Sequence, residues 1–241
     1  MVSVSDLSIA IYADGADLET IAARAKDPLI KGFTTNPTLM RKRGIQDYEG
    51  FAKDALALVG DRSISFEVFA DDFPTMEKQA RRIASWGKNV SVKIPITNTK
   101  GESAASLIRT LSADGVSVNV TAIMTEAQVK DVADALSADT SAIVSVFAGR
   151  IADTGRDPVP MMQRCKDILN GKPMAQLLWA SPREVLNLFQ ADAVGCEIIT
   201  MTDDLLKKLG GTGKDLDVFS LETVKMFFDD ATSAGYDIAV D

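Results

Sequence analysis

Lys93 is the residue whose surroundings point most directly to chemistry. It stands in a short run, residues 90–96, in which Val90, Val92, Ile94 and Ile96 alternate with Ser91, Lys93 and Pro95. A two-residue period rich in β-branched side chains predicts a strand. An ammonium on a buried strand must lose its charge, find an anionic partner or react. A desolvated lysine amine is a nucleophile for carbonyl substrates, so this position suggests Schiff-base chemistry.

Further strands of the same kind are needed to surround such a lysine. We find eight short apolar runs whose centres lie roughly 20 to 35 residues apart, the length of a strand, a helix and two loops. The runs are residues 8–13, 30–35, 64–70, 90–96, 116–122, 142–148, 175–180 and 196–201. The segments between them have helical patterns. The sequence therefore predicts an α/β protein, a single (β/α)8 TIM barrel over residues 1–241.

Two helix starts and the end of the chain refine this prediction. Thr125 and Gln128 form a capping box at the start of a helix over 125–136. Ser181 with Glu184, and Pro182 at the first helical position, predict another helix start. An additional C-terminal helix is expected at about 221–234, which either completes the eighth unit or packs on a neighbouring subunit. A doubly wound open sheet is the alternative fold, but the turn at residues 14–17 lacks its glycine fingerprint.

Polar side chains gather on one face of these strands. In a barrel, alternate residues point inward, and the apolar set of each strand should face the helices. The opposite parity predicts these inward residues: Asp14, Thr34, Asn36, Ser65, Glu67, Ser91, Lys93, Ser117, Asn119, Thr121, Ser145, Phe147, Trp179 and Ser181. Most of them lie toward the carboxyl ends of the strands, where barrel enzymes carry their active sites. A barrel built only for stability would fill this space with branched aliphatic residues.

Each of these residues has a simpler explanation when it is taken alone. Lys93 could form a structural ion pair with Glu67, Asp14 could cap a turn, and Ser181 could only cap its helix. Arg150 and Arg183 follow predicted strand ends by two or three residues, and could grip a phosphate or form ordinary surface ion pairs. The shared parity favours a common site over separate structural roles.

Composition excludes several classes of function. The 241 residues carry a formal net charge of −8, which argues against nucleic acid or an anionic membrane as the partner. There is no histidine, so Ser-His-Asp catalysis and most zinc sites are ruled out, and no metal is expected. Cys165 and Cys196 read as packing residues of a cytoplasmic protein. No signal peptide and no apolar run of membrane-spanning length is apparent.

Several segments resemble the transaldolase family, in the order that the family has them. The segment over residues 32–38, Gly-Phe-Thr-Thr-Asn-Pro-Thr, resembles the family signature, and residues 92–95, Val-Lys-Ile-Pro, resemble its Schiff-base lysine motif. Further blocks match at residues 119–121, 145–151 and 179–181, so the resemblance covers roughly residues 9–206. The chain length resembles the small-subunit branch, which includes the fructose-6-phosphate aldolases and forms ring-like decamers.

The resemblance implies a role for each catalytic residue. Lys93 matches the lysine that forms the Schiff base, and Asp14 matches the acid/base at the substrate C4 hydroxyl. Glu67 and Thr121 match the pair that positions a catalytic water. Sugar phosphates would be the substrates in the pentose phosphate pathway, a homo-oligomer would be the assembly, and no cofactor would be required.

The resemblance also implies a substrate-binding set. Asn36 and Asn119 match contacts to the dihydroxyacetone hydroxyls, Ser145 a further substrate contact, and Arg150 and Arg183 the phosphate grip. The expected set is Thr34, Asn36, Asn119, Ser145, Phe147, Arg150, Ser181 and Arg183. After Ser181 the chain passes directly into Pro182, which predicts a shorter loop than the family usually has before the helix.

Two positions separate the branches of the family. The resembling aldolases have glutamine where this chain has Glu67, and tyrosine where it has Phe147. A tyrosine hydroxyl beside the enamine could help water to protonate and release it, whereas phenylalanine donates no hydrogen bond. The sequence therefore favours a transaldolase over an aldolase that releases free dihydroxyacetone. A non-catalytic sugar-phosphate-binding barrel is the alternative from another class.

Overall fold

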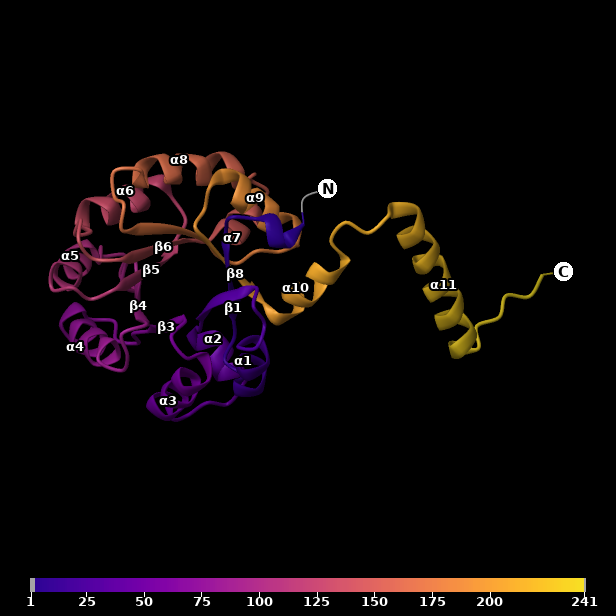
Figure 1. Ribbon diagram of the computed structural model, residues 1–241, viewed down its shortest axis with the longest axis horizontal. Helices are drawn as coiled ribbons and strands as arrows, with labels where there is room; N and C mark the ends of the chain where they lie inside the picture. Colours follow the sequence, from indigo (N-terminus) through magenta and orange to yellow (C-terminus); the bar gives the residue numbers. More distant parts are fainter. Residues whose placement is uncertain (1–2, 241) are drawn as a thin grey trace.

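The computed structural model describes residues 3–240, and its centre is a closed barrel of eight parallel strands in sequence order (Figure 1). The strands are β1 (Ala10–Asp14), β2 (Ile30–Thr34), β3 (Ser63–Glu67), β4 (Val90–Pro95), β5 (Val118–Ile123), β6 (Ala142–Val146), β7 (Ala175–Trp179) and β8 (Ile198–Thr202). Each strand falls on one of the runs expected from the sequence, and β1 closes the barrel by pairing with β8. The predicted (β/α)8 barrel is confirmed, and the doubly wound sheet is excluded.

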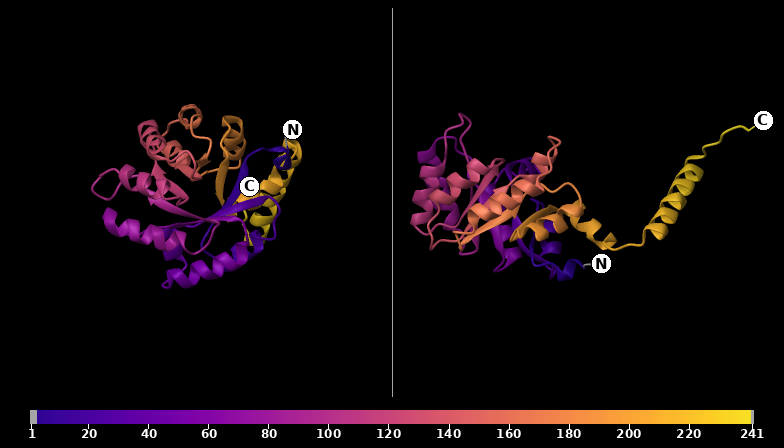
Figure 2. Two further views of the ribbon diagram at one scale, coloured as in Figure 1. Left: turned by 60° about the vertical axis from the view of Figure 1, so that its left-hand side comes forward. Right: turned by 90° about the horizontal axis from the view of Figure 1, so that it is seen from above.

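Helices surround the outside of the barrel (Figure 2). The helical elements are η1 (Val4–Asp6), α1 (Leu18–Arg24), α2 (Pro37–Lys42), α3 (Tyr48–Val59), α4 (Phe73–Ala84), α5 (Ala105–Ala113), α6 (Glu126–Ala135), α7 (Ala148–Ala152), α8 (Val159–Leu169), α9 (Leu186–Val194), α10 (Asp203–Lys208), η2 (Leu209–Gly211) and α11 (Leu216–Ala234). The capping box predicted for α6 is present, because the Thr125 hydroxyl accepts from Gln128 N–H and the Gln128 side chain reaches back to Thr125 N–H.

Two apolar layers hold the barrel together. The larger lies between the strands and the helices and contains the aliphatic residues that the parity assigned to the outside, such as Val92 and Ile94. Burying a side chain of this size stabilises the fold by about 1.5–3 kcal/mol. A smaller cluster fills the interior and includes Tyr12, Ile143 and Ile198. The inward and outward faces of the strands were thus predicted correctly for most of the barrel.

β7 is the exception. The sequence placed Trp179 inside the barrel, but Trp179 is fully buried in the outer layer against the helices. Leu178 and Ala180 belong to the interior cluster instead. The register explains the reversal, because Leu178 lies opposite Ser145 of β6 and neighbouring residues in a ladder share a face.

The helix start predicted at Ser181 is also wrong. Helix α9 begins only at Leu186, and Ser181 has the left-handed backbone angle φ 57°. No side chain caps α9 at its N-cap residue, Val185. The Asn187 side chain holds the preceding loop instead, since its Oδ1 accepts from the N–H groups of Arg183 (2.7 Å) and Glu184 (3.2 Å). The connection from β7 to its helix is therefore longer than the Ser-Pro pattern suggested.

α11 stands apart from the barrel, as Figures 1 and 2 show. It is 19 residues long and buries none of them. The predicted additional C-terminal helix is confirmed, but it does not cover its own barrel, so a single domain over residues 1–241 stays a prediction. Within residues 3–240, no helix combines the length and the apolar character that a membrane crossing requires.

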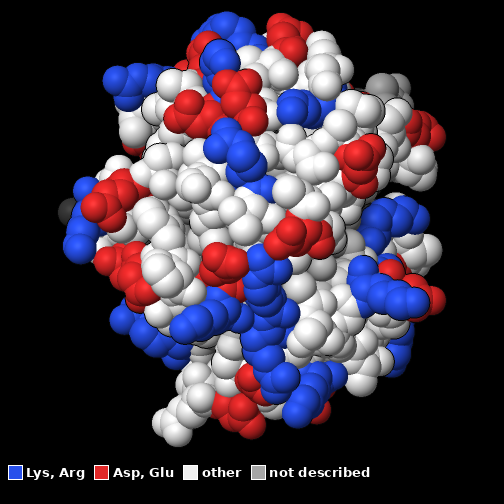
Figure 3. Space-filling model, turned by 90° about the vertical axis from the view of Figure 1, so that its left-hand side faces the viewer, with Lys and Arg blue, Asp and Glu red and all other residues white. Residues whose placement is uncertain are grey.

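Charge is mixed on the face of the barrel turned away from α11. Figure 3 shows acidic and basic side chains interspersed on this face, with a run of Lys and Arg side chains leading from its middle toward the lower edge. The net charge of the whole chain is −8. An anionic ligand must therefore be held by local cations and not by the overall field.

Candidate active site

A cavity of about 550 Å³ opens at the carboxyl ends of the strands. Every residue that the sequence assigned to the site lines it: Asp14, Thr34, Asn36, Glu67, Lys93, Asn119, Thr121, Ser145, Phe147, Arg150, Ser181 and Arg183. These residues come from seven consecutive strands or from the segments that directly follow them. The barrel thus brings together side chains that lie up to 169 positions apart, from 14 to 183, in the sequence.

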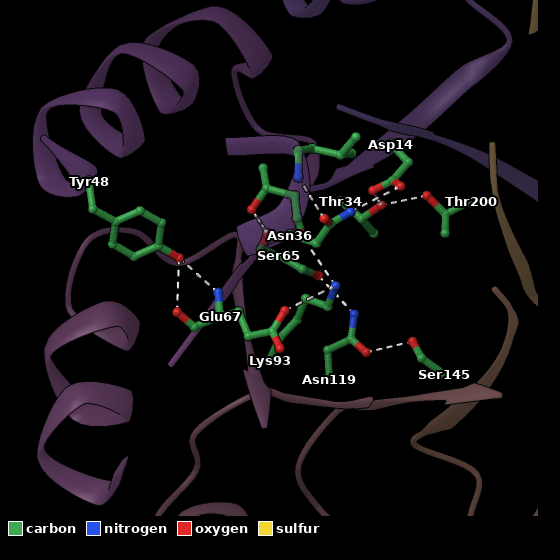
Figure 4. A network of polar contacts seen from close by, with 12 residues as sticks. Asp14, Thr34, Asn36, Tyr48, Ser65, Glu67, Lys93, Asn119, Ser145 and Thr200 are labelled. Carbon is green, nitrogen blue, oxygen red and sulfur yellow. Dashed lines mark hydrogen bonds and ion pairs between the residues drawn. The ribbon is translucent and has the colours of Figure 1, made fainter. Parts of the chain in front are cut away.

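Lys93 lines this cavity and belongs to the polar network that Figure 4 shows. Its residue is 7% exposed, and Val92 and Ile94 on either side of it are fully buried in the outer layer. The Nζ atom donates a hydrogen bond to the Thr35 carbonyl oxygen at 2.9 Å and lies 3.6 Å from Glu67 Oε2. The amine is therefore held by a peptide group and one carboxylate, with the open cavity before it.

Asp14, the last residue of β1, is the second carboxylate of the cavity. Its Oδ1 accepts from the Thr34 hydroxyl at 2.7 Å, and its Oδ2 from Asn36 Nδ2 at 3.4 Å. The Thr34 hydroxyl is also 2.5 Å from that of Thr200 on β8. Asn36 is fixed in turn as the N-cap of α2, because its Oδ1 accepts from Leu39 N–H at 3.0 Å.

A second series of hydrogen bonds joins polar side chains of β6, β5 and β3. Ser145 Oγ donates to Asn119 Oδ1 at 2.6 Å, and Asn119 Nδ2 donates to Ser65 Oγ at 3.0 Å. Asn119 is fully buried, and Thr121, two residues further along β5, is nearly so. These bonds fix the orientation of the Asn119 amide, so its polar atoms present a defined pattern to a ligand.

Burial perturbs both carboxyl groups. Desolvation raises the pKa of Asp14, and the nearby Lys93 charge and the hydrogen bonds from Thr34 and Asn36 offset part of this rise. Desolvation likewise raises the pKa of Glu67, Lys93 offsets part of it, and the Asp14 charge adds to it. Buried carboxyl groups with raised pKa values beside a lysine are typical of sites at which protons are transferred.

Two arginines lie at the rim of the cavity. Arg183 is held by Asp153, with Nε 2.9 Å from Oδ1 and a second ion-pair contact from its terminal nitrogen. Arg150 lies over the Phe147 ring, 5.4 Å from the ring centroid, and has no ion pair within residues 3–240. Arg183 thus forms the ion pair that was one of the two alternatives, while a phosphate grip by either arginine stays a prediction.

Helix α7, which carries Arg150, touches the loop after β7, which carries Arg183, at Gly149. Its N–H donates to the Ala180 carbonyl at 3.3 Å, and a Cβ atom added at this position would lie 1.5 Å from the Ser181 carbonyl oxygen. Only glycine permits this approach. It places Arg150 and Arg183 at the same edge of the cavity.

Some residues of the cavity escaped sequence analysis. Thr200 lies on β8 and points into the barrel. It was missed because the sequence analysis assigned no inward residues to this strand. Lys42, at the end of α2, lines the cavity from a helix, and Ala122 does so with a left-handed φ of 62°. Tyr48 of α3 bonds the peptide of Glu67 from outside the barrel, and no pattern in the sequence indicates this contact.

Within the part of the chain that the structure describes, residues 3–240, no three histidine, cysteine or acidic side chains cluster as a metal site would require. Cys165 and Cys196 are both buried, and both thiols are free.

The fold and the cavity together define a (β/α)8-barrel protein whose inward polar side chains converge on one buried lysine. Comparison with known protein families identifies one family over nearly the whole chain. The family described as Transaldolase/Fructose-6-phosphate aldolase matches residues 11–239, nearly the whole chain, and the protein belongs to this family.

Relatives in three distant organisms agree with this assignment. The chain is 35% identical over 200 residues to a probable transaldolase of Dehalococcoides mccartyi, with 83% of this chain and 89% of that protein covered. It is 33% identical over 207 residues to a probable transaldolase of Nitrosopumilus maritimus, with coverages of 83% and 86%. A probable transaldolase 2 of Listeria monocytogenes is 33% identical over 199 residues, with coverages of 82% and 87%.

The barrel also resembles a solved structure from outside this group. The crystal structure of KGPDC from Streptococcus mutans superposes with a TM-score of 0.55 and 12% sequence identity, covering 80% of this chain and 87% of that one. This likeness concerns the fold alone.

Proposed function

We propose that the protein is a transaldolase, which moves a three-carbon dihydroxyacetone unit from a ketose phosphate to an aldose phosphate through a Schiff base on Lys93. The observation that carries the proposal is the buried Lys93 amine, which lies 3.6 Å from Glu67 and opens onto a polar cavity of about 550 Å³. A cavity of this volume accommodates a six- or seven-carbon sugar phosphate. Family membership supports the same conclusion.

The reaction starts at the C2 ketone of the donor, fructose 6-phosphate or sedoheptulose 7-phosphate. The Lys93 amine adds to C2 and water leaves, which gives an iminium. Asp14 takes the proton of the C4 hydroxyl, and the C3–C4 bonding electrons move toward the iminium as the aldose phosphate leaves. The enamine that remains on Lys93 adds to the aldehyde carbon of the acceptor, and the same steps in reverse release the new ketose.

Glu67 and Thr121 are suited to handle the water in this cycle. Addition of the amine to C2 needs one proton to reach the departing oxygen, and hydrolysis of the product iminium needs one to be removed from water. Glu67 lies beside the Lys93 amine, and burial raises its pKa above that of an ordinary glutamate, which makes it a better proton acceptor when it is ionised. Thr121 lines the same cavity and adds a hydroxyl that can orient the water.

The remaining polar groups divide between the two ends of the substrate. The three-carbon end is assigned to Thr34, Asn36, Asn119 and Ser145, whose amides and hydroxyls suit sugar hydroxyls. The phosphate is assigned to Arg150, with Arg183 and Ser181 beside it, because a guanidinium binds a phosphate through two parallel hydrogen bonds.

Phe147 favours transfer over simple release. It lines the cavity and has no hydroxyl with which to guide water to the enamine. The enamine is therefore protected until an acceptor arrives. A sugar-phosphate exchange of this kind belongs to the pentose phosphate pathway, and the cytoplasm is the compartment in which we propose it occurs.

A borohydride trapping experiment tests the proposal. Reduction in the presence of fructose 6-phosphate should leave a three-carbon adduct on the peptide that contains Lys93, as seen by mass spectrometry. The Lys93→Met variant should lose the adduct and the transfer activity but keep its fold. The matched control is Lys31→Met, since Lys31 lies on β2 with its side chain exposed, and this variant should behave as wild type.

Three outcomes would contradict the scheme. Retained activity in Lys93→Met would exclude the Schiff base on this lysine. Absence of any wild-type adduct would favour a barrel that only binds sugar phosphates. Rapid release of dihydroxyacetone without an acceptor would favour the aldolase.

We also propose that the protein is a homo-oligomer whose α11 helices pack on neighbouring copies. The helix exposes large apolar side chains, with Phe227 63% and Phe228 70% exposed, and lies away from its own barrel. Exposed apolar surface of this extent marks an interaction site. We propose that the partner is another copy of this chain, because in a closed ring each copy covers the α11 helix of a neighbour and no helix stays exposed. The resemblance to the small-subunit branch suggests a ring of ten copies.

Light scattering on a sizing column tests the assembly. The wild-type chain should elute as an oligomer, and a variant carrying Phe227→Asp and Phe228→Asp should dissociate toward monomers. A matched control is Leu29→Asp, which changes an exposed apolar residue before β2, outside α11. A monomeric wild-type protein would refute the assembly.

A further inference from the structure

The ladder between β2 and β3 stops where the active site begins. Its last rung is the hydrogen bond from Thr35 N–H to the Ser65 carbonyl at 3.2 Å. In a regular parallel ladder the next rung would join Glu67 N–H to the Thr35 carbonyl. The chain instead turns at Asn36 into α2, and the two peptide groups find other partners. Thr35 O accepts from Lys93 Nζ at 2.9 Å, and Glu67 N–H donates to the Tyr48 hydroxyl at 2.8 Å (Figure 4).

The Tyr48 hydroxyl takes the place of the missing strand. Besides accepting from Glu67 N–H, it donates to the Glu67 carbonyl oxygen at 3.0 Å. One hydroxyl thus satisfies both peptide groups of the same residue. Burial raises the pKa of Tyr48 far above the physiological range, so its proton stays available for the donated bond.

Tyr48 is itself rigidly held. It is the first residue of α3, and Asp47 caps that helix by accepting from Gly50 N–H at 2.9 Å. Its ring makes edge contacts with Phe66 at 6.2 Å and with Trp86 at 5.7 Å between centroids. The capped helix and the Trp86 ring hold Tyr48 from outside β3, so its hydroxyl can serve as an anchor point for the end of that strand.

We propose that Tyr48 is a positioning residue for Glu67, which it holds at the distance from Lys93 that water handling requires. This inference rests on the proposed function. Tyr48 does not line the cavity, so it acts only through the Glu67 peptide. The Glu67 carboxylate is joined to this backbone by its own side chain. A small displacement of the backbone therefore changes the distance between the carboxylate and Lys93 Nζ.

Loss of the hydroxyl should change the rate more than substrate binding. Tyr48→Phe keeps the ring and its packing but leaves the Glu67 peptide free to shift. We expect kcat to fall about 10-fold, within the range for a displaced acid/base group. KM for the ketose phosphate should change little, because the phosphate side of the cavity, at Arg150 and Arg183, is built from other loops.

The pH profile should move as well. The charged groups that face Glu67 are Lys93 of β4 and Asp14 of β1, and Tyr48 of α3 faces its peptide. Lys93 lowers the pKa of Glu67 and Asp14 raises it. A Glu67 carboxylate that drifts from Lys93 loses the lowering influence, so its pKa rises and the acid limb of kcat moves to higher pH. A purely structural tyrosine would not move this limb.

The experiment compares four variants with wild type: Tyr48→Phe, Glu67→Gln, the double variant of both, and Tyr12→Phe. Tyr12→Phe is the matched control, because it removes the same atom from a buried tyrosine in the interior cluster and away from this cavity. Each protein is first tested for the borohydride adduct with fructose 6-phosphate. Steady-state kinetics across pH and the melting temperature then follow.

The expected result is a lower kcat and a raised acid limb in Tyr48→Phe, a wild-type profile in Tyr12→Phe, and no further loss when Tyr48→Phe is added to Glu67→Gln. A wild-type kcat and acid limb in Tyr48→Phe, even with a lower melting temperature, would overturn the proposal. So would an equal loss in the Glu67→Gln background. Absence of the adduct in wild type would instead refute the proposed function itself, and the positioning role with it.

Discussion

At Gly149, helix α7 packs closely against the loop after β7, and replacing this glycine with alanine would force the two segments apart. The added Cβ would lie 1.5 Å from Ser181 O and 2.6 Å from its carbonyl carbon. A carbon and a carbonyl oxygen need about 3.3 Å, so the helix and the loop must separate by about 1.8 Å, the difference between 3.3 and 1.5 Å. The displaced partner is backbone and not a flexible side chain, so this strain cannot be relieved by a change of rotamer.

A shift of this size exceeds the tolerance of a hydrogen bond, and Arg150 is the adjacent residue. One charge-assisted hydrogen bond contributes about 1.5–3 kcal/mol, so its loss should lower kcat/KM for fructose 6-phosphate by about 10- to 150-fold. Schiff-base trapping with unphosphorylated dihydroxyacetone should be unchanged, because Lys93 lies on β4 and not on the two segments that meet at Gly149.

The assay therefore measures both substrates in Gly149→Ala. Gly171→Ala is the control, since an added Cβ at Gly171 meets nothing within 4 Å. The reasoning is refuted if Gly149→Ala keeps a wild-type kcat/KM for the phosphorylated donor. It is also refuted if trapping with dihydroxyacetone falls by the same factor, because the damage would then extend beyond the phosphate side.

Three further variants test the charges of the site. Burial raises the pKa of Glu67 in the folded state. The folded protein therefore gains stability from the protonated form of this side chain. That contribution is complete below the unfolded pKa of about 4.3 and is lost as the pH rises through the folded pKa. Glu67→Gln should therefore melt at a higher temperature than wild type at pH 7 and at the same temperature near pH 4; an equal melting temperature at pH 7 would contradict this. Phe147→Tyr should increase dihydroxyacetone release relative to transfer, measured by product analysis without an acceptor, and an unchanged ratio would count against the role given to the missing hydroxyl. Asp153→Asn should weaken the hold on Arg183 and raise KM for the phosphorylated donor several-fold with little change in kcat, whereas a lower kcat at constant KM would show that Arg183 acts elsewhere.

The sequence predicted the site well wherever a strand alternates between polar and apolar residues. β5 is such a strand, because Val118 and Val120 face the helices while Asn119 and Thr121 line the cavity. β7 does not alternate, since Ala175, Leu177, Leu178 and Trp179 are all buried. A strand that is apolar on both faces carries no parity signal, so its inward residues depend on the register with β6, which the sequence does not specify.

The error at Ser181 has a different origin. A serine followed by proline and, three residues on, by glutamate is a local helix-start signal. Here a long-range contact overrides it, because the close approach of Gly149 fixes the Ser181 carbonyl and the backbone adopts a positive φ of 57°. Asn187, in the first turn of α9, then accepts from Arg183 N–H with its side chain and so holds the loop that precedes the helix. Ser181 nevertheless lines the cavity, since its position depends on the end of β7 and not on the helix.

The end of β2 shows how one local signal in the sequence organises the reactive lysine. Pro37 has no N–H, and Asn36 uses its side chain to cap α2, so the chain leaves the sheet after Thr35. A carbonyl oxygen without a ladder partner is costly when it is buried, and Thr35 is 1% exposed. The Lys93 amine supplies the missing donor. The Thr-Asn-Pro segment thus creates the acceptor that orients the lysine, and the same interruption leaves the Glu67 N–H to the Tyr48 hydroxyl. A variant that extended β2 by one rung would remove both contacts together, which ties the geometry of the site to the point where this strand ends.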